Sequence, residues 1–232
     1  MKGVFVSGTD TGVGKTRVAA GLVRAMAAEG VPVCGIKPVA AGAERTAEGL
    51  RNEDALALQA AGSIALDYEV VNPVCLEPAM APHLAAAAVG VSLETGGLAR
   101  QIRAGVPEEA LAVVEGAGGW LVPTAPGETL ADLAVALGLP VVLVVGLRLG
   151  CLNHALLTVE NIERRGLPLA GWVANRIDPE MAAPDANRDT LRERITAPLL
   201  AELPHAPNAT PEDIGYRLGP AASELLGKGL LT

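Results

Sequence analysis

A lysine and a threonine close a glycine-containing segment near the start of the chain, Gly8-Thr9-Asp10-Thr11-Gly12-Val13-Gly14-Lys15-Thr16. Glycines let backbone amides converge on phosphate oxygens, and a helix N-terminus adds a favourable dipole. The strand-like run Val4-Phe5-Val6 precedes the segment and a helical pattern over Thr16–Ala28 follows it. This is the context that a phosphate loop requires. We therefore predict nucleotide binding, with Lys15 on the β- and γ-phosphates and the Thr16 hydroxyl on Mg²⁺.

The segment departs from the general phosphate-loop spacing at its first glycine. The pattern GxxxxGK[ST] needs glycine at position 9, where the chain has Thr9, and Gly8 lies one residue too early. The segment is closer to the variant loop of ParA and MinD ATPases, which carries a lysine where this chain has Asp10. A glycine-rich turn without a ligand is the alternative interpretation. Lysine is scarce in this chain, and its use in the loop favours phosphate binding because a compact ammonium fits between phosphates.

Three further charged side chains stand where a catalytic site is expected. Lys37 comes just after the strand-like run Val33–Ile36, and Glu115 directly follows the apolar run Leu111–Val114. Ligands gather at the carboxyl ends of parallel strands. Lys37 is therefore predicted to neutralise charge on a transferring phosphoryl group, and Glu115 to bind Mg²⁺. A solvated surface lysine is the alternative for Lys37. Asp54 opens a predicted helix, where an acid could merely complement the helix dipole.

Short apolar runs alternate with helical patterns along the chain. Further strands are predicted at Val141–Val145 and Ala170–Ala174, and helices at Asn52–Ala61, Leu93–Arg103, Thr129–Leu137, Asn153–Arg165 and Asp189–Leu200. Pro73–Pro82 is predicted to be an ordered loop. Continuous apolar strands separated by helices indicate a mainly parallel sheet with helices on both faces, and right-handed crossovers make it doubly wound. We predict an α/β fold of the P-loop NTPase type, in one domain over residues 1–232.

Composition limits the classes of function. Hydrophobic residues make up 50% of the 232 residues, which disfavours disorder, and the net charge of -8 disfavours a nucleic-acid partner. Three scattered cysteines without a CxxC pattern indicate reduced thiols, and the N-terminal apolar run is too short for a signal peptide. The uncharged stretch Leu133–Leu147 is interrupted by Pro140 and is shorter than the ~18 residues of a membrane span. We expect a soluble, cytoplasmic protein without a membrane partner.

Several segments together resemble the dethiobiotin synthetase family. They cover nearly the whole chain: Gly8–Thr16, Lys37–Val39, Gly49–Ala55, Val71–Pro73, Glu77-Pro78, Ala81–His83, Val114–Trp120, Leu149–Ala155 and Gly171–Asn175. The loop alone is shared with many ATPases, whereas the combination is specific. The resemblance implies that 7,8-diaminononanoate, CO₂ (or bicarbonate) and MgATP give dethiobiotin, ADP and phosphate. A substrate carbamate would attack the γ-phosphate to form a carbamic-phosphoric anhydride, and the second amine would close the ureido ring.

The resemblance also implies roles for individual residues. Lys15, Lys37 and Thr11 would be catalytic, with Thr11 close to the carbamate, and Thr16, Asp54 and Glu115 would hold Mg²⁺. The nucleotide would also contact Gly12, Val13, Gly14, Gly116, Ala117, Gly118, Asn175, Arg176, Pro204, His205 and Ala206. The substrate would contact Thr11, Lys37, Ala41, Pro82, Gly118, Gly150, Cys151, Leu152 and Asn153. The last four open a predicted helix whose N-terminus suits a carboxylate. In the family this carboxylate is bound by the partner subunit, so a homodimer is implied.

Two positions depart from the family pattern. Ala41 stands where members usually carry Ser or Thr, which removes a hydroxyl contact to substrate, and Gly12 stands where many carry Glu. These changes are expected to alter affinity more than reaction type.

Two other functions share the predicted fold. A ParA- or MinD-like ATPase switch acting through a protein partner is disfavoured by Asp10 and by the lack of a basic amphipathic tail in Gly219–Thr232. A cobyrinate-type amide ligase normally carries a glutaminase domain, for which this chain has no room.

Overall fold

The computed structural model describes residues 1–227. At its centre lies a six-stranded sheet in the order β10-β9-β8-β1-β7-β2, in which all neighbouring strands are parallel. These strands are β1 (Lys2–Gly8), β2 (Val33–Ile36), β7 (Leu111–Glu115), β8 (Val141–Leu147), β9 (Leu169–Arg176) and β10 (Leu199–Leu203). Residues 228–232, which end the predicted domain and include Lys228, lie outside the described part of the chain.

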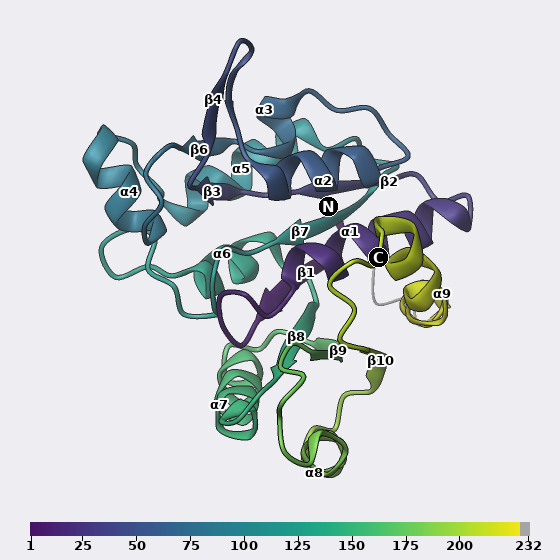
Figure 1. Cartoon of the computed structure of the whole chain (residues 1–232). Helices are drawn as coiled ribbons and strands as arrows, with labels where there is room; N and C mark the ends of the chain where they lie inside the picture. Colours follow the sequence, from purple (N-terminus) through teal and green to yellow (C-terminus); the bar gives the residue numbers. More distant parts are fainter. Residues whose placement is uncertain (228–232) are drawn as a thin grey trace.

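Helices cover both faces of the sheet (Figure 1). One face packs against α1 (Lys15–Ala28), α2 (Glu53–Ala61) and α9 (Pro211–Gly227). The other packs against α5 (Thr95–Gly105), α6 (Leu130–Leu137), α7 (Cys151–Arg164) and α8 (Pro184–Arg194). The predicted α/β architecture with a mainly parallel sheet is thereby confirmed. No helix within residues 1–227 combines the length and the apolar character that a bilayer crossing would need.

The central strands are buried on both faces, as their continuous apolar runs predict. Every residue of β7 and β8 is buried. Along β1, Val4 and Val6 join the core beneath α1, whereas Phe5 joins the core on the other side. The Phe5 and Trp120 rings form a T-shaped pair, with the ring centroids 6.2 Å apart. Because the sheet packs against a hydrophobic core on each face, its strands keep their places. The carboxyl ends of β1, β2, β7 and β8 are therefore held in a defined order.

Several short elements beside this sheet were not predicted. β3 (Val39–Ala41) pairs with β6 (Val74–Leu76), and β4 (Glu44–Thr46) forms a hairpin with β5 (Gly49–Arg51). Two helices, α3 (Tyr68–Val71) and α4 (Pro82–Val89), complete this region. The predicted loop Pro73–Pro82 therefore contains a strand and meets a helix. All of these elements except α4 have three or four residues and are too short for a hydrophobic period to reveal them.

The helix predicted over Asp189–Leu200 is wrong at its C-terminal end. α8 ends at Arg194, and β10 follows from Leu199. Pro198 explains the break, because proline disfavours the helical conformation of the preceding residue and cannot donate a helical hydrogen bond. Its carbonyl instead accepts the Trp172 N–H at 3.0 Å, next to the first pairing of β10 with β9. The helix α9 was not predicted from the sequence.

Candidate active site

The phosphate loop connects β1 to α1 at the carboxyl edge of the sheet. Gly12 and Gly14 have φ angles of 75° and 90°, in the left-handed region that favours glycine. A Cβ at Gly14 would also lie 2.3 Å from the Asn175 side-chain nitrogen. The Lys15 ammonium donates to the Asp10 carbonyl oxygen at 3.0 Å. Lys15 therefore folds back across its own loop, where the predicted phosphates would lie.

Asp10 holds the loop to the neighbouring strand end. Its carboxylate pairs with Arg148, which follows β8. The other Asp10 oxygen accepts the Thr11 N–H at 2.7 Å. The position that carries a lysine in ParA- and MinD-type loops thus forms an ion pair within this chain.

Burial changes the acidity of Lys15. The residue is only 7% exposed, and this burial, together with the nearby Lys37 ammonium, lowers the pKa of Lys15 to about 8. A phosphate group beside Lys15 would stabilise the ammonium form and raise that pKa again. Lys15 therefore holds its proton less firmly in the free protein than it would beside a bound phosphate.

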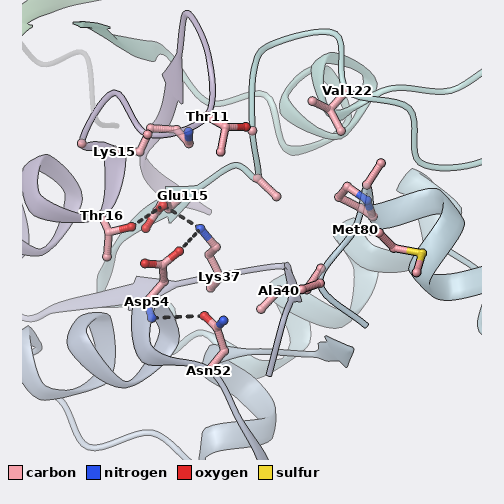
Figure 2. A pocket seen from close by; sticks show the side chains of 18 of the residues that line it. Thr11, Lys15, Thr16, Lys37, Ala40, Asn52, Asp54, Met80, Glu115 and Val122 are labelled. Carbon is pink, nitrogen blue, oxygen red and sulfur yellow. Dashed lines mark hydrogen bonds and ion pairs between the residues drawn. The ribbon is translucent and has the colours of Figure 1, made fainter. Parts of the chain in front are cut away.

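A buried ion cluster lies beside the loop (Figure 2). The Lys37 ammonium is 2.6 Å from Glu115 Oε1 and 2.9 Å from Asp54 Oδ2. Glu115 Oε1 also accepts the Thr16 hydroxyl at 2.9 Å. Lys37 is only 4% exposed, so the alternative of a solvated surface lysine is wrong. Four side chains from β7, α1, α2 and the segment after β2 thus converge on one point.

Burial and the neighbouring charges act in opposite directions on the pKa values of this cluster. Burial raises the pKa of Glu115 above its ordinary value, although the Lys37 ammonium opposes this shift. Burial also acts to raise the pKa of Asp54, but Lys37 outweighs it and holds that pKa below its usual range. Burial acts to lower the pKa of Lys37, yet the two carboxylates outweigh it and raise that pKa. Lys37 is therefore an ammonium ion at neutral pH.

The oxygens of this cluster fit a magnesium ion. Glu115 Oε2 is buried and has no hydrogen-bond partner. A buried acceptor without a donor is costly, and a metal ion would satisfy it. The Asp54 carboxylate and the Thr16 hydroxyl supply further hard oxygens, the ligand type that Mg²⁺ prefers.

A cavity of about 730 Å³ opens over the loop and the cluster. Its volume lies within the ~300–1,000 Å³ common for small-molecule sites. The predicted site residues that line it are Thr11, Gly12, Gly14, Lys15, Thr16, Lys37, Ala41, Asp54, Pro82, Glu115, Ala117 and Gly118. The structure therefore brings together the phosphate loop, the acids and most of the predicted substrate contacts.

The cavity also has walls that sequence reasoning missed. Figure 2 shows Met80 and Val122 across the cavity from the ion cluster. Neither residue belongs to a sequence motif, and only the tertiary fold brings the two to the same cavity. Asn52 could have been found, because asparagine before an acidic helix start indicates an N-cap. Its side-chain oxygen accepts the N–H groups of Asp54 and Ala55 at 3.1 and 3.3 Å.

The nucleotide contacts predicted at Asn175, Arg176 and residues 204–206 lie along, or just after, the neighbouring strands β9 and β10. Asn175 is 2% exposed, and its amide donates to the Val13 carbonyl at 2.8 Å. Arg176 is ion-paired with Glu202, with its Nε 2.6 Å from the carboxylate. Residues 204–206 follow β10 at the same edge of the sheet. None of these residues lines the 730 Å³ cavity. Asn175 contacts the phosphate loop at Val13, and the Ala206 carbonyl accepts from Arg17 of α1.

The N-terminus of α7 does not reach the cavity of its own chain. Gly150 caps the helix with a φ of 95°, and Cys151 is buried beneath it. A second cavity of about 420 Å³ lies between α7 and the phosphate loop, and Thr11 and His154 are among its lining residues. Gly150, Cys151, Leu152 and Asn153 line neither cavity.

Known proteins resemble this chain in sequence and in fold. A family model described as an AAA domain (AAA_26) matches residues 2–213. The ATP-dependent dethiobiotin synthetase BioD of Cellvibrio japonicus is 55% identical over 203 residues, which cover 88% of this chain and 89% of that protein. The chain belongs to the dethiobiotin synthetase family. Another member, BioD of Pseudomonas paraeruginosa, is 52% identical over 94% of this chain and 96% of its own length.

Solved structures share the fold of this dethiobiotin synthetase family member at much lower identity. The cell division ATPase MinD of Pyrococcus furiosus has a TM-score of 0.63 and 18% identity, covering 99% of this chain and 100% of MinD. Cobyrinic acid a,c-diamide synthase of Mycobacterium smegmatis, with bound ADP and magnesium, has a TM-score of 0.54 and 16% identity, covering 99% and 96%. This likeness shows the P-loop NTPase fold alone and does not favour the ATPase switch.

Proposed function

We propose that the chain forms dethiobiotin from 7,8-diaminononanoate and CO₂ with the consumption of ATP. The observation that carries the proposal is the convergence of Lys15 and Lys37 with Glu115 and Asp54 at a phosphate loop. Half of all positions match named dethiobiotin synthetases over nearly the full length. A reaction that builds and then cleaves a phosphorylated intermediate needs this concentration of cations and acids.

In the proposed complex, the ATP phosphates lie along the loop amides and Lys15. Thr16, Asp54 and Glu115 would hold Mg²⁺, which when bound neutralises charge on the β- and γ-phosphates. Gly116, Ala117 and Gly118 follow Glu115 directly. The Gly116 N–H donates to the Val6 carbonyl at 3.0 Å, so Ala117 and Gly118 would supply the amides for the nucleotide.

The adenine would lie on the β9 and β10 side of the loop. Asn175 uses its NH₂ group on the Val13 carbonyl, and its amide oxygen would accept from the adenine amino group. Arg176 and residues 204–206 would form the rest of that side. The Arg17 guanidinium donates to the Ala206 carbonyl at 2.7 Å, which ties this segment to the helix of the phosphate loop.

The proposed chemistry needs phosphorylation because a carbamate is a poor electrophile. One substrate amine adds to CO₂ and loses a proton, giving the carbamate. A carbamate oxygen then attacks the γ-phosphorus, and the bond to the ADP oxygen breaks. The second amine attacks the carbonyl carbon of the resulting anhydride, the bond to the phosphate oxygen breaks, and the amine releases a proton. Lys15 and Lys37 stabilise the charge on the transferring phosphoryl group.

The substrate would occupy the part of the cavity beyond the ion cluster. Thr11, Gly118, Ala41 and Pro82 all line this cavity. Ala41 places a methyl group where most family members have a hydroxyl. We therefore propose an apolar contact to the diamine at that position.

A second copy of the chain would complete the substrate site. Gly150, Cys151, Leu152 and Asn153 line neither the 730 Å³ nor the 420 Å³ cavity of their own chain, and Leu149 beside them is 94% exposed. The amides of a helix N-terminus suit the distant carboxylate of a substrate bound in the partner. We expect light scattering to give twice the monomer mass. A mass of one chain at high protein concentration would contradict the shared site. We further propose that the enzyme acts as one domain in the cytoplasm.

The proposed reaction makes phosphate release depend on every substrate. We expect phosphate and a product of the mass of dethiobiotin only when diaminononanoate, bicarbonate and MgATP are all present. A coupled phosphate assay and mass spectrometry, with each component omitted in turn, measure this. Equal phosphate release without the diamine would instead indicate an ATPase switch.

A further inference from the structure

A buried tyrosine outside the cavity connects the two segments that carry Asn52 and Asn72 next to the ion cluster. Tyr68 of α3 is 7% exposed. Its hydroxyl accepts the backbone N–H of Asn52 at 2.8 Å and donates to the side-chain oxygen of Asn72 at 3.2 Å. Asn52 and Asn72 are themselves buried. One hydroxyl therefore satisfies a buried donor and a buried acceptor on two different segments.

The Asn72 side of this arrangement fixes the backbone of Lys37. The Asn72 amide donates to the Lys37 carbonyl at 2.6 Å and to the Val74 carbonyl at 3.2 Å. Both amide protons are thereby used, so the remaining Asn72 oxygen needs a donor, and the Tyr68 hydroxyl is that donor. The Lys37 N–H also donates to the Val71 carbonyl at 2.7 Å. The segment from Tyr68 onward thus holds Lys37 at both its N–H and its C=O.

The Asn52 side fixes the start of α2. The Asn52 side chain caps the helix through the N–H of Asp54, while the Asn52 N–H itself is held by Tyr68. Asp54 lies in the first turn, so its position depends on this cap. The Arg51 guanidinium covers the Tyr68 ring, 4.2 Å from its centroid. Burial raises the pKa of Tyr68 to about 12, which keeps its proton in place at neutral pH.

We propose that Tyr68 is a positioning residue for the magnesium and phosphoryl-transfer site, setting Asp54 through Asn52 and Lys37 through Asn72. The inference rests on the proposed magnesium site at Asp54 and Glu115. Groups that orient metal ligands from behind commonly contribute ~10- to 100-fold to metal affinity or activity. Without the hydroxyl, the Asn52 N–H and the Asn72 oxygen lose their partners, and both segments relax.

The test is Tyr68→Phe, which keeps the ring beneath Arg51 and removes one oxygen atom. We expect MgADP affinity and kcat each to fall about ten-fold, because Asp54 and Lys37 both lose their support. ADP affinity in the presence of EDTA should not change, since the phosphate loop is untouched. Calorimetry measures both affinities. Tyr216→Phe is the matched control, because Tyr216 is 88% exposed on α9, and all three values should equal those of the wild type.

Asp54→Asn separates this inference from the magnesium assignment. In Asp54→Asn, magnesium should no longer increase the affinity for ADP. The double variant Asp54→Asn/Tyr68→Phe should then bind MgADP as well as Asp54→Asn alone. If Asp54→Asn keeps that gain, the magnesium assignment fails, and this inference fails with it. If Asp54→Asn loses the gain while Tyr68→Phe keeps wild-type MgADP affinity and kcat, Tyr68 serves stability alone and only the inference is overturned. A lower melting temperature of Tyr68→Phe alone would not support it.

Discussion

Replacing Lys37 by alanine is expected to lower kcat by ~10²- to 10³-fold, the usual cost of losing one preorganised group that stabilises transition-state charge. The Lys37 ammonium is buried 2.6 Å from Glu115 and lies beside the loop that carries Lys15. No water can replace it at the same place with a full positive charge. MgADP affinity should stay within a few-fold of wild type, because both carboxylates remain. Phosphate release at saturating MgATP and calorimetry with MgADP measure the two effects.

The same substitution is expected to lower stability in the absence of nucleotide. Breaking a buried ion pair commonly costs ~3–5 kcal/mol. Glu115 limits this cost, since burial already raises its pKa and lets it take up a proton. Chemical denaturation with and without MgADP shows whether the variant is folded under assay conditions. Lys2→Ala is the control, because Lys2 is an exposed lysine of β1. A kcat near that of the wild type in a folded Lys37→Ala would remove Lys37 from the mechanism.

The sequence predicts the position of charged groups best where they follow central strands. Lys37 and Glu115 come just after apolar runs, and Lys15 ends the glycine-containing loop that follows another. Parallel strands bring such residues to one edge of the sheet. Asp54 is different, because it reaches the cluster only through the placement of α2 against the sheet. Family resemblance assigned it to the metal, and the structure shows it 2.9 Å from the Lys37 ammonium.

The parts that escaped prediction depend on contacts between distant segments. Tyr68 sits in a four-residue helix, and its partners Asn52 and Asn72 come from either side of it. No periodic pattern predicts a hydroxyl that joins two such segments. Asn175 was predicted to contact the nucleotide, and its hydrogen bond to the Val13 carbonyl shows that it also supports the loop. The family resemblance assigns a role to a residue, whereas the structure shows which of its atoms already form hydrogen bonds within the protein.

Replacing Lys15 by glutamine is expected to weaken ADP binding about 100-fold and to remove its pH dependence above pH 8. The pKa of Lys15 is about 8 without nucleotide, and bound phosphate raises it. Above pH 8, binding must therefore take up a proton, so the wild-type affinity should fall as pH rises from 8 to 9 and stay nearly constant from 7 to 7.5. Lys37 does not titrate in this range, because its carboxylate partners raise its pKa.

Calorimetry with ADP and EDTA tests this without any contribution from the metal. In buffers of different ionisation enthalpy at pH 8.5, the observed heat should depend on the buffer for the wild type and for Lys2→Gln, but much less for Lys15→Gln. The sign is fixed by the linkage between binding and protonation, since the bound state holds more protons than the free state. If proton uptake in Lys15→Gln equals that of the wild type, another group supplies it. The ammonium of Lys15 would then remain charged throughout, and its burial in the loop would not control nucleotide affinity.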